Sequence, residues 1–269
     1  MRKIAAFTDA DLFLGTGGVC AKTLCLATVL ACGLGASMAW APSAQAEGNV
    51  QASVADGNLI ITGDGRDNNI IVIQETSSVR VAGRAGTTVN RERILFETEG
   101  VDVNIEMRGG DDFVRVEVVP GFDMAIPGDL QIDTGKQDDM IELLGIAVAG
   151  ETRIDTGDGN DIVFIDGVFS PNEEFITSDF AGRFAVETGD KEDLVEINHA
   201  IFRGEVDVKL GSGIDGACSH ASEYQNLDQT SFDGGEPPDD DRFFNLVGVV
   251  TNFEGGEDDD CSFLGGRDF

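Results

Sequence analysis

One short phrase of glycines and aspartates recurs six times along this chain of 269 residues, and its residue types are those of a calcium site. The copies are Gly63–Asp67, Gly109–Asp112, Gly135–Asp139, Gly157–Asp161, Gly189–Asp193 and Gly211–Asp215. Calcium prefers carboxylate oxygens together with carbonyl oxygens of flexible turns, and glycine permits the left-handed backbone of such turns. Eight aspartates are the candidate metal ligands: Asp67, Asp112, Asp139, Asp158, Asp161, Asp190, Asp193 and Asp215.

The aspartates that close these phrases would repel one another if the repeats stack. Equivalent residues in stacked parallel strands lie about 4.8 Å apart. Two unit charges at that distance repel by about 0.9 kcal/mol in water and about 3.5 kcal/mol at an effective dielectric near 20. A bound divalent cation would remove this repulsion, so we expect Ca²⁺ as the cofactor. The alternative is that glycine and aspartate are only favourable turn residues that face water.

Short strands are the elements that would position these turns. Seven residues before each closing aspartate stands an apolar residue in an alternating apolar and polar pattern, which is typical of a half-buried strand: Ile60, Ile105, Ile132, Ile154, Val186 and Val208. Apolar pairs after the aspartate, such as Ile162-Val163, predict a second strand. A third short strand leads to a second glycine corner, for example at Gly150.

The spacing of the closing aspartates sets the size of the repeat. The intervals are 45, 27, 22, 32 and 22 residues, so the basic unit has 22 residues, with one roughly doubled interval and two insertions. Three strands and three corners in one such unit predict an all-β fold, a parallel β-helix (β-solenoid) of about 22-residue coils.

The best-formed phrase carries a family resemblance. Residues 156–164 resemble the nine-residue G-G-x-G-x-D-x-U-x repeat of RTX, or haemolysin-type, calcium-binding proteins, and residues 62–70 and 210–218 are similar. The resemblance implies that Asp67, Asp161 and Asp215 bind calcium between successive coils. The chain departs from that family in its longer unit and in the glycines replaced by Arg108, Gln137 and Lys191. In these respects it is nearer to the longer repeats of bacterial surface proteins.

Composition restricts the partners. The formal net charge is -32 from 18 basic and 50 acidic residues, which disfavours nucleic acid and anionic membranes as partners. Only two histidines are present, and arginines are sparse, whereas cleavage of an acidic polysaccharide needs basic side chains and a proton acceptor. We therefore expect no enzyme activity; the alternative is a parallel β-helix enzyme that acts on polysaccharides.

The first 46 residues have the pattern of a signal peptide. Basic residues precede a largely apolar run from residue 24 to 41, and Ala44-Gln45-Ala46 matches the small-residue cleavage pattern. We therefore expect an exported protein that begins near Glu47 and is secreted, at the cell surface or in the periplasm. Two alternatives stay open: an uncleaved membrane anchor and a lipoprotein acylated at Cys32.

Two cysteines remain after the leader. Because export leads to an oxidising compartment, we expect a disulfide between Cys218 and Cys261 that ties the tail to the end of the solenoid; two free thiols are the alternative. The predicted domains are 1–46 (signal peptide), 47–221 (parallel β-helix repeats) and 222–269 (acidic C-terminal cap region).

The predicted function is that of a non-catalytic, exported calcium-binding β-solenoid that serves as a structural or adhesive module. The 27- and 32-residue intervals gain residues 117–127 and 166–179, which contain Phe122, Phe169 and Phe175. Insertions in a solenoid are displayed on one face, so these aromatic residues either form a small exposed surface or fold back onto the coil. The expected partners are calcium and a cell-surface polysaccharide or protein.

Overall fold

The structure is a computed structural model, and it describes residues 48–74, 79–90, 96–98, 102–118, 125–170, 173–235, 241–244, 246 and 248–251. These residues belong to one compact unit, Pro42–Phe269. The predicted signal peptide, residues 1–46, lies outside the described residues. No helix in the described part of the chain is long and apolar enough to cross a membrane.

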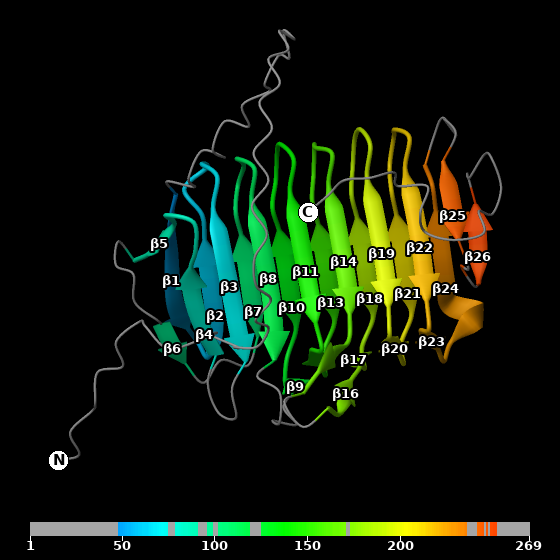
Figure 1. The fold of residues 1–269 in the computed structure, drawn as a ribbon, viewed down its shortest axis with the longest axis horizontal. Helices are drawn as coiled ribbons and strands as arrows, with labels where there is room; N and C mark the ends of the chain where they lie inside the picture. The colour runs from blue at the N-terminus through cyan, green and yellow to red at the C-terminus, as the bar shows by residue number, and fades with distance from the viewer. Residues whose placement is uncertain are drawn as a thin grey trace, which may run out of the picture. The chain divides into compact units, whose positions relative to one another are not determined.

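Parallel β-sheets make up almost all of the described structure, and successive repeats lie side by side in them (Figure 1). The largest sheet has ten strands: β1 (Asn49–Ala55), β2 (Asn58–Thr62), β5 (Thr88–Val89), β7 (Val103–Glu106), β10 (Leu130–Asp133), β13 (Thr152–Asp155), β18 (Phe184–Glu187), β21 (Val206–Lys209), β24 (Thr230–Asp233) and β26 (Val249–Thr251). From β2 to β26 every neighbouring pair in this sheet is parallel.

The strands that directly follow the aspartate turns belong to a second sheet. Its nine strands are β3 (Asn69–Gln74), β4 (Val79–Gly83), β6 (Phe96–Thr98), β8 (Phe113–Val118), β11 (Met140–Leu144), β14 (Ile162–Asp166), β19 (Leu194–Asn198), β22 (Gly216–His220) and β25 (Arg242–Phe244). The third sheet has five short strands: β9 (Ala125–Ile126), β12 (Ala147–Val148), β17 (Ser178–Phe180), β20 (Ala200–Phe202) and β23 (Glu223–Tyr224). A hairpin of β15 (Val168–Phe169) and β16 (Phe175–Ile176) and one 3-10 turn, η1 (Leu227–Gln229), complete the described elements.

Each of the five central repeats, from β7 to β23, adds one strand to each of the three sheets, so equivalent residues pair directly. Ile132 of β10 lies opposite Ile154 of β13, and the sheet continues with Val186 and Val208. These side chains are buried, whereas the alternating residues Gln131 and Arg153 are exposed; in β18 the alternating residue, Ala185, is buried as well. Buried residues of all three sheets form one hydrophobic core. The predicted all-β class and the 22-residue periodicity are confirmed, and the arrangement is consistent with a parallel β-helix.

The first repeat differs from the predicted alignment by one residue. Ile61, not Ile60, lies opposite Ile105, and Asn69 lies opposite Phe113. Asn68 therefore takes the position of Asp112, and the prediction that Asp67 holds it was wrong. A one-residue shift turns every side chain of a strand to the other face, and the buried pair Leu59 and Ile61 sets the register here.

Antiparallel strands cover the start of the parallel stack. β1 pairs antiparallel with β2, and β4 lies antiparallel between β3 and β6. The strands β4, β5 and β6 come from the doubled 45-residue interval. Because an open sheet edge invites pairing with other chains, this interval supplies an end cap rather than a repeat.

At the C-terminal end of the stack, parallel pairing extends beyond residue 222, where the predicted cap region begins. β24 continues the ten-stranded sheet next to β21, and β25 pairs with β22. Residues 252–269, including Cys261, lie outside the described residues, so the disulfide stays a prediction.

Candidate functional site

Five of the predicted aspartates form a buried row at one corner of the repeat, which we call the aspartate ladder. Each stands directly before a strand of the nine-stranded sheet, and parallel register brings equivalent residues of successive repeats together. Their exposed fractions are between 0 and 3 %: Asp112, Asp139, Asp161, Asp193 and Asp215. The alternative, in which the turn aspartates only face water, is therefore wrong for these five.

One oxygen of each ladder carboxyl connects two repeats. Oδ1 of Asp161 accepts a hydrogen bond of 2.8 Å from the backbone N–H of Asp139, and Oδ1 of Asp193 accepts one from Asp161. The same bond recurs along the row from Asn68 to Asp241. Each carboxyl thus satisfies a buried backbone donor at the turn of the preceding repeat, where no strand pairing is available.

The second oxygen of each ladder carboxyl is the unusual feature. Oδ2 of Asp112, Asp139, Asp161, Asp193 and Asp215 is buried, and among the described residues it accepts no hydrogen bond. A buried carboxylate oxygen without a partner is costly, and this row repeats that cost in five successive repeats. Such oxygens require a proton or a cation.

Burial raises the pKa of every ladder carboxyl above its usual value near 4. The pKa rises to about 8 for Asp112 and Asp193, to about 7 for Asp139 and Asp215, and to about 6 for Asp161. Desolvation is the largest cause, and neighbouring carboxylates raise most of these values further.

Threonine hydroxyls beside three of the carboxyls lower their pKa: those of Thr134, Thr156 and Thr188. However, Thr156 Oγ1 donates its single proton to the carbonyl oxygen of Thr188 at 3.1 Å, and Thr188 Oγ1 donates to that of Leu210 at 2.7 Å. These hydroxyls therefore do not fully satisfy the carboxyls.

The raised pKa values predict how the calcium-free protein responds to pH. The folded state holds protons that the unfolded chain releases near pH 4, so the free energy of unfolding should fall as the pH rises from about 4 to about 8. We expect the thermal midpoint, measured in chelator, to fall by several degrees over this range. Asp193→Asn should reduce the fall of the thermal midpoint with pH, whereas Asp158→Asn, at an exposed site, should not. If the two variants show the same dependence of the midpoint on pH, burial of charge in the aspartate ladder is contradicted.

The glycines of the repeated phrase are needed for close stacking of the turns. A Cβ atom on Gly157 would lie 1.9 Å from the carbonyl oxygen of Gly135, and one on Gly189 would lie 1.9 Å from that of Gly157. Both residues also have positive φ angles, +86° and +96°. Consecutive turns thus touch through their backbones, and no side chain fits between them.

Hydrogen bonds between the turns already use several of their carbonyl oxygens. Gly135 O accepts from the N–H of Asp158 at 3.0 Å, and Gly189 O accepts from Ser212 at 2.8 Å. A carbonyl oxygen has two lone pairs, so these groups retain one site for a cation.

The other three predicted ligands lie apart from the ladder. Asp158 and Asp190 are exposed on the turn and lie opposite each other. Asp190 Oδ1 accepts a hydrogen bond of 2.6 Å from the Ser212 hydroxyl, and Asp158 lies 3.7 Å from the Lys136 ammonium group. Asp67 accepts from the backbone N–H of Asp111 at 3.0 Å.

The eight predicted ligands therefore do not gather in one cluster. Within the described ranges, no group of three histidine, cysteine, aspartate or glutamate side chains is placed to hold one metal ion. A cation at the ladder would have to be shared between the carboxyls of neighbouring repeats and backbone carbonyl oxygens.

Sequence reasoning missed the two residues that flank the aspartate ladder. Asn68 precedes it: its Nδ2 donates to Asp112 Oδ1 at 3.1 Å and its backbone N–H donates to the same oxygen at 2.7 Å. Asp241 follows Asp215 at the other end, where its Oδ1 accepts from the Asp215 N–H at 2.8 Å. The spacing of 26 residues between Asp215 and Asp241 is close to the repeat length and could have indicated this position, but Asp241 stands within a run of three aspartates.

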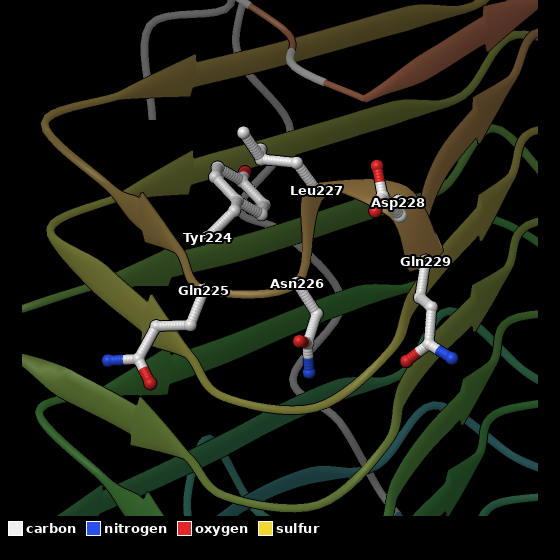
Figure 2. A pocket seen from close by; sticks show the side chains of 6 residues that line it. All are labelled: Tyr224, Gln225, Asn226, Leu227, Asp228 and Gln229. Carbon is white, nitrogen blue, oxygen red and sulfur yellow. The ribbon is translucent and has the colours of Figure 1, made fainter.

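A separate pocket lies at the turn after β23. Its lining is a single continuous segment, Tyr224 to Gln229, whose amide side chains are drawn in Figure 2. Burial raises the pKa of Tyr224 to about 12, and its hydroxyl lies 2.9 Å from the Ser219 hydroxyl. Asp228 is the one carboxylate of this lining, so the pocket offers hydrogen-bonding groups but no pair of acid and base.

Comparison with protein-family models, curated proteins and solved structures gave no match for this chain. The similarity to RTX repeats therefore rests on the residues of the repeated phrase.

Proposed function

We propose that this chain is an exported, non-catalytic calcium-binding β-solenoid, related in principle to RTX repeats, that serves as a structural or adhesive module. The observation that carries the proposal is the aspartate ladder, whose five buried Oδ2 atoms accept no hydrogen bond from the part of the chain that the structure describes. Calcium supplies the positive charge that such a column lacks and prefers oxygen ligands.

The ladder carboxyls would hold the ions through Oδ2, with carbonyl oxygens of the glycine turns completing the coordination. Calcium would bind the ionised carboxyls and so displace the protons that burial otherwise retains. Each ion would bind to groups of neighbouring repeats, and binding would therefore stabilise the contacts on which a repeat protein depends. The three sheets share one core, and we infer that they close into a complete parallel β-helix.

A non-catalytic role is proposed over polysaccharide cleavage because two of the arginines that could hold a polyanion are already paired with carboxylates. Arg183 contacts Glu205 and Asp207, at 3.3 and 3.1 Å. Arg203 contacts Asp179 at 2.6 Å. An adhesive contact with a polysaccharide or protein would instead use the β15–β16 hairpin, where the Phe169 side chain is 71 % exposed.

Calcium titration tests the proposal. Binding to the folded state alone adds about 2.7 kcal/mol at a hundredfold excess over Kd, which raises the thermal midpoint of a chain of this size by roughly 5 to 10 °C. The midpoint should be measured by calorimetry in chelator, in millimolar Ca²⁺ and in Mg²⁺ at matched ionic strength.

Two substitutions in the same turn provide the control. Asp161→Asn removes a buried ladder charge and should reduce the calcium-dependent rise, whereas Asp158→Asn removes an exposed charge and should leave most of it. An identical midpoint in chelator and in millimolar calcium would rule out the calcium site.

A further inference from the structure

The only two histidines of the chain lie next to each other. His220 ends β22 and pairs with Asn198 of β19, while His199 follows β19 directly. Their ring centroids are 6.1 Å apart at an interplanar angle of 84°. The fold thus brings together two imidazoles from successive repeats. They lie at the C-terminal ends of strands in the nine-stranded sheet, whereas the aspartate ladder lies at the N-terminal ends of these strands.

A carboxylate orients the first imidazole. His199 Nδ1 lies 2.9 Å from Asp166 Oδ1. When Nδ1 carries the proton and donates to this carboxylate, the lone pair is on Nε2. The Phe175 ring contacts His199 edge-on at a centroid distance of 4.8 Å. A carboxylate behind a histidine is the usual outer contact of a metal-binding imidazole.

The backbone holds His199 in a conformation that favours glycine. Its φ angle is +47°, and two repeats earlier along the nine-stranded sheet Gly145 takes the same corner with φ +59°. A residue with a side chain is strained in this region whereas glycine is not, and such strain is concentrated at functional sites. Ala221, at the same corner one repeat later, also has a positive φ, +50°, and it provides a control position.

We propose that His199 and His220 bind a divalent transition-metal ion of the zinc class, with Asp166 as the outer contact and water in the remaining positions. A metal about 2.0–2.1 Å from a ring nitrogen of each histidine places the two centroids about 5.2 Å apart at a tetrahedral angle and about 6.4 Å apart at a linear one. The observed 6.1 Å lies between these values, so the two exposed rings would move about 0.9 Å closer to reach tetrahedral geometry. Nitrogen ligands favour zinc over calcium, so this site is chemically distinct from the ladder and does not depend on the proposed function.

Exposure and charge both allow a metal ion to enter. The His199 side chain is 40 % exposed, and His220 is also exposed. The chain has a net charge of -32, which raises the local concentration of cations.

Zinc titration of the chain without a histidine tag tests the proposal. We expect one Zn²⁺ per chain by calorimetry and changes in both histidine ring resonances, which are easy to assign because there are only two. His199→Asn and His220→Asn should each abolish saturable binding, and Asp166→Asn should weaken it about 10-fold or more. Ala221→Gly relaxes the same corner without changing a ligand and should bind zinc as the unsubstituted chain does.

Three results would overturn the proposal. The first is the absence of saturable zinc binding, and the second is zinc binding that survives in His220→Asn. The third is zinc binding that is lost in Asp161→Asn but kept in His199→Asn. Stabilisation by calcium should persist in His220→Asn, so failure here is distinguishable from failure of the calcium site.

Discussion

Replacing Gly157 by alanine should destabilise the protein by more than about 4 kcal/mol, which is exceptional for one methyl group. The added Cβ atom would lie 1.9 Å from the carbonyl oxygen of Gly135, which belongs to the rigid backbone of the neighbouring turn. The two turns would have to separate, and separation would break the hydrogen bond from the Asp158 N–H to Gly135 O. The urea midpoint, together with the yield of folded protein, measures this effect.

Gly65→Ala is the matched control for Gly157→Ala. Gly65 also has a positive φ, +74°, but nothing lies within 4 Å of the position of its Cβ atom. The substitution should therefore cost only the conformational penalty, about 1–2 kcal/mol. If the two variants lose equal stability, close stacking of the turns is not what requires glycine at position 157.

Loss of the expected disulfide between Cys218 and Cys261 should have the second largest effect. The bond would enclose about 44 residues, for which loop closure contributes about 4 kcal/mol. Cys218 is fully buried in β22, which pairs with β25 near the end of the stack. Because repeats are stabilised mainly by their neighbours, the loss should loosen this end first.

Hydrogen exchange measures where protection is lost. In Cys218→Ser we expect faster exchange from about Leu210 onward, while the strands around Ile132 and Ile154 remain protected. Cys261→Ser should give the same pattern while leaving the buried Cys218 side chain unchanged, and it separates the disulfide from the packing of Cys218. Two titratable thiols in correctly exported protein would show that the bond does not form.

The alternation of apolar and polar residues was sufficient to predict the strands of the regular repeats and the repeat length. Ile132, Ile154, Val186 and Val208 recur at the same distance from an aspartate, and the structure pairs them in register. Periodicity of this kind is local, because it expresses only which face of a strand is buried. For the same reason it did not distinguish Asp67 from Asn68 in a first repeat that has no parallel repeat before it.

The end caps and the placement of the aspartates depended on the tertiary structure. The doubled interval gave no periodic signal, and its strands β4 and β6 are recognisable as a cap only through their antiparallel pairing beside β3. Nothing in the phrase itself shows that Asp161 is buried and Asp158 exposed, because both are suitable turn residues.

The sequence alone determined the all-β class, the repeat of about 22 residues and the acidic character of the chain, since each follows from residue types and their spacing. Only the tertiary structure decided which carboxyls lose water, which glycines touch a neighbouring turn, and that the two histidines meet beside Asp166. The physical reason is that burial and close contact arise between repeats. They depend on the register in which distant segments pair, which no single repeat specifies.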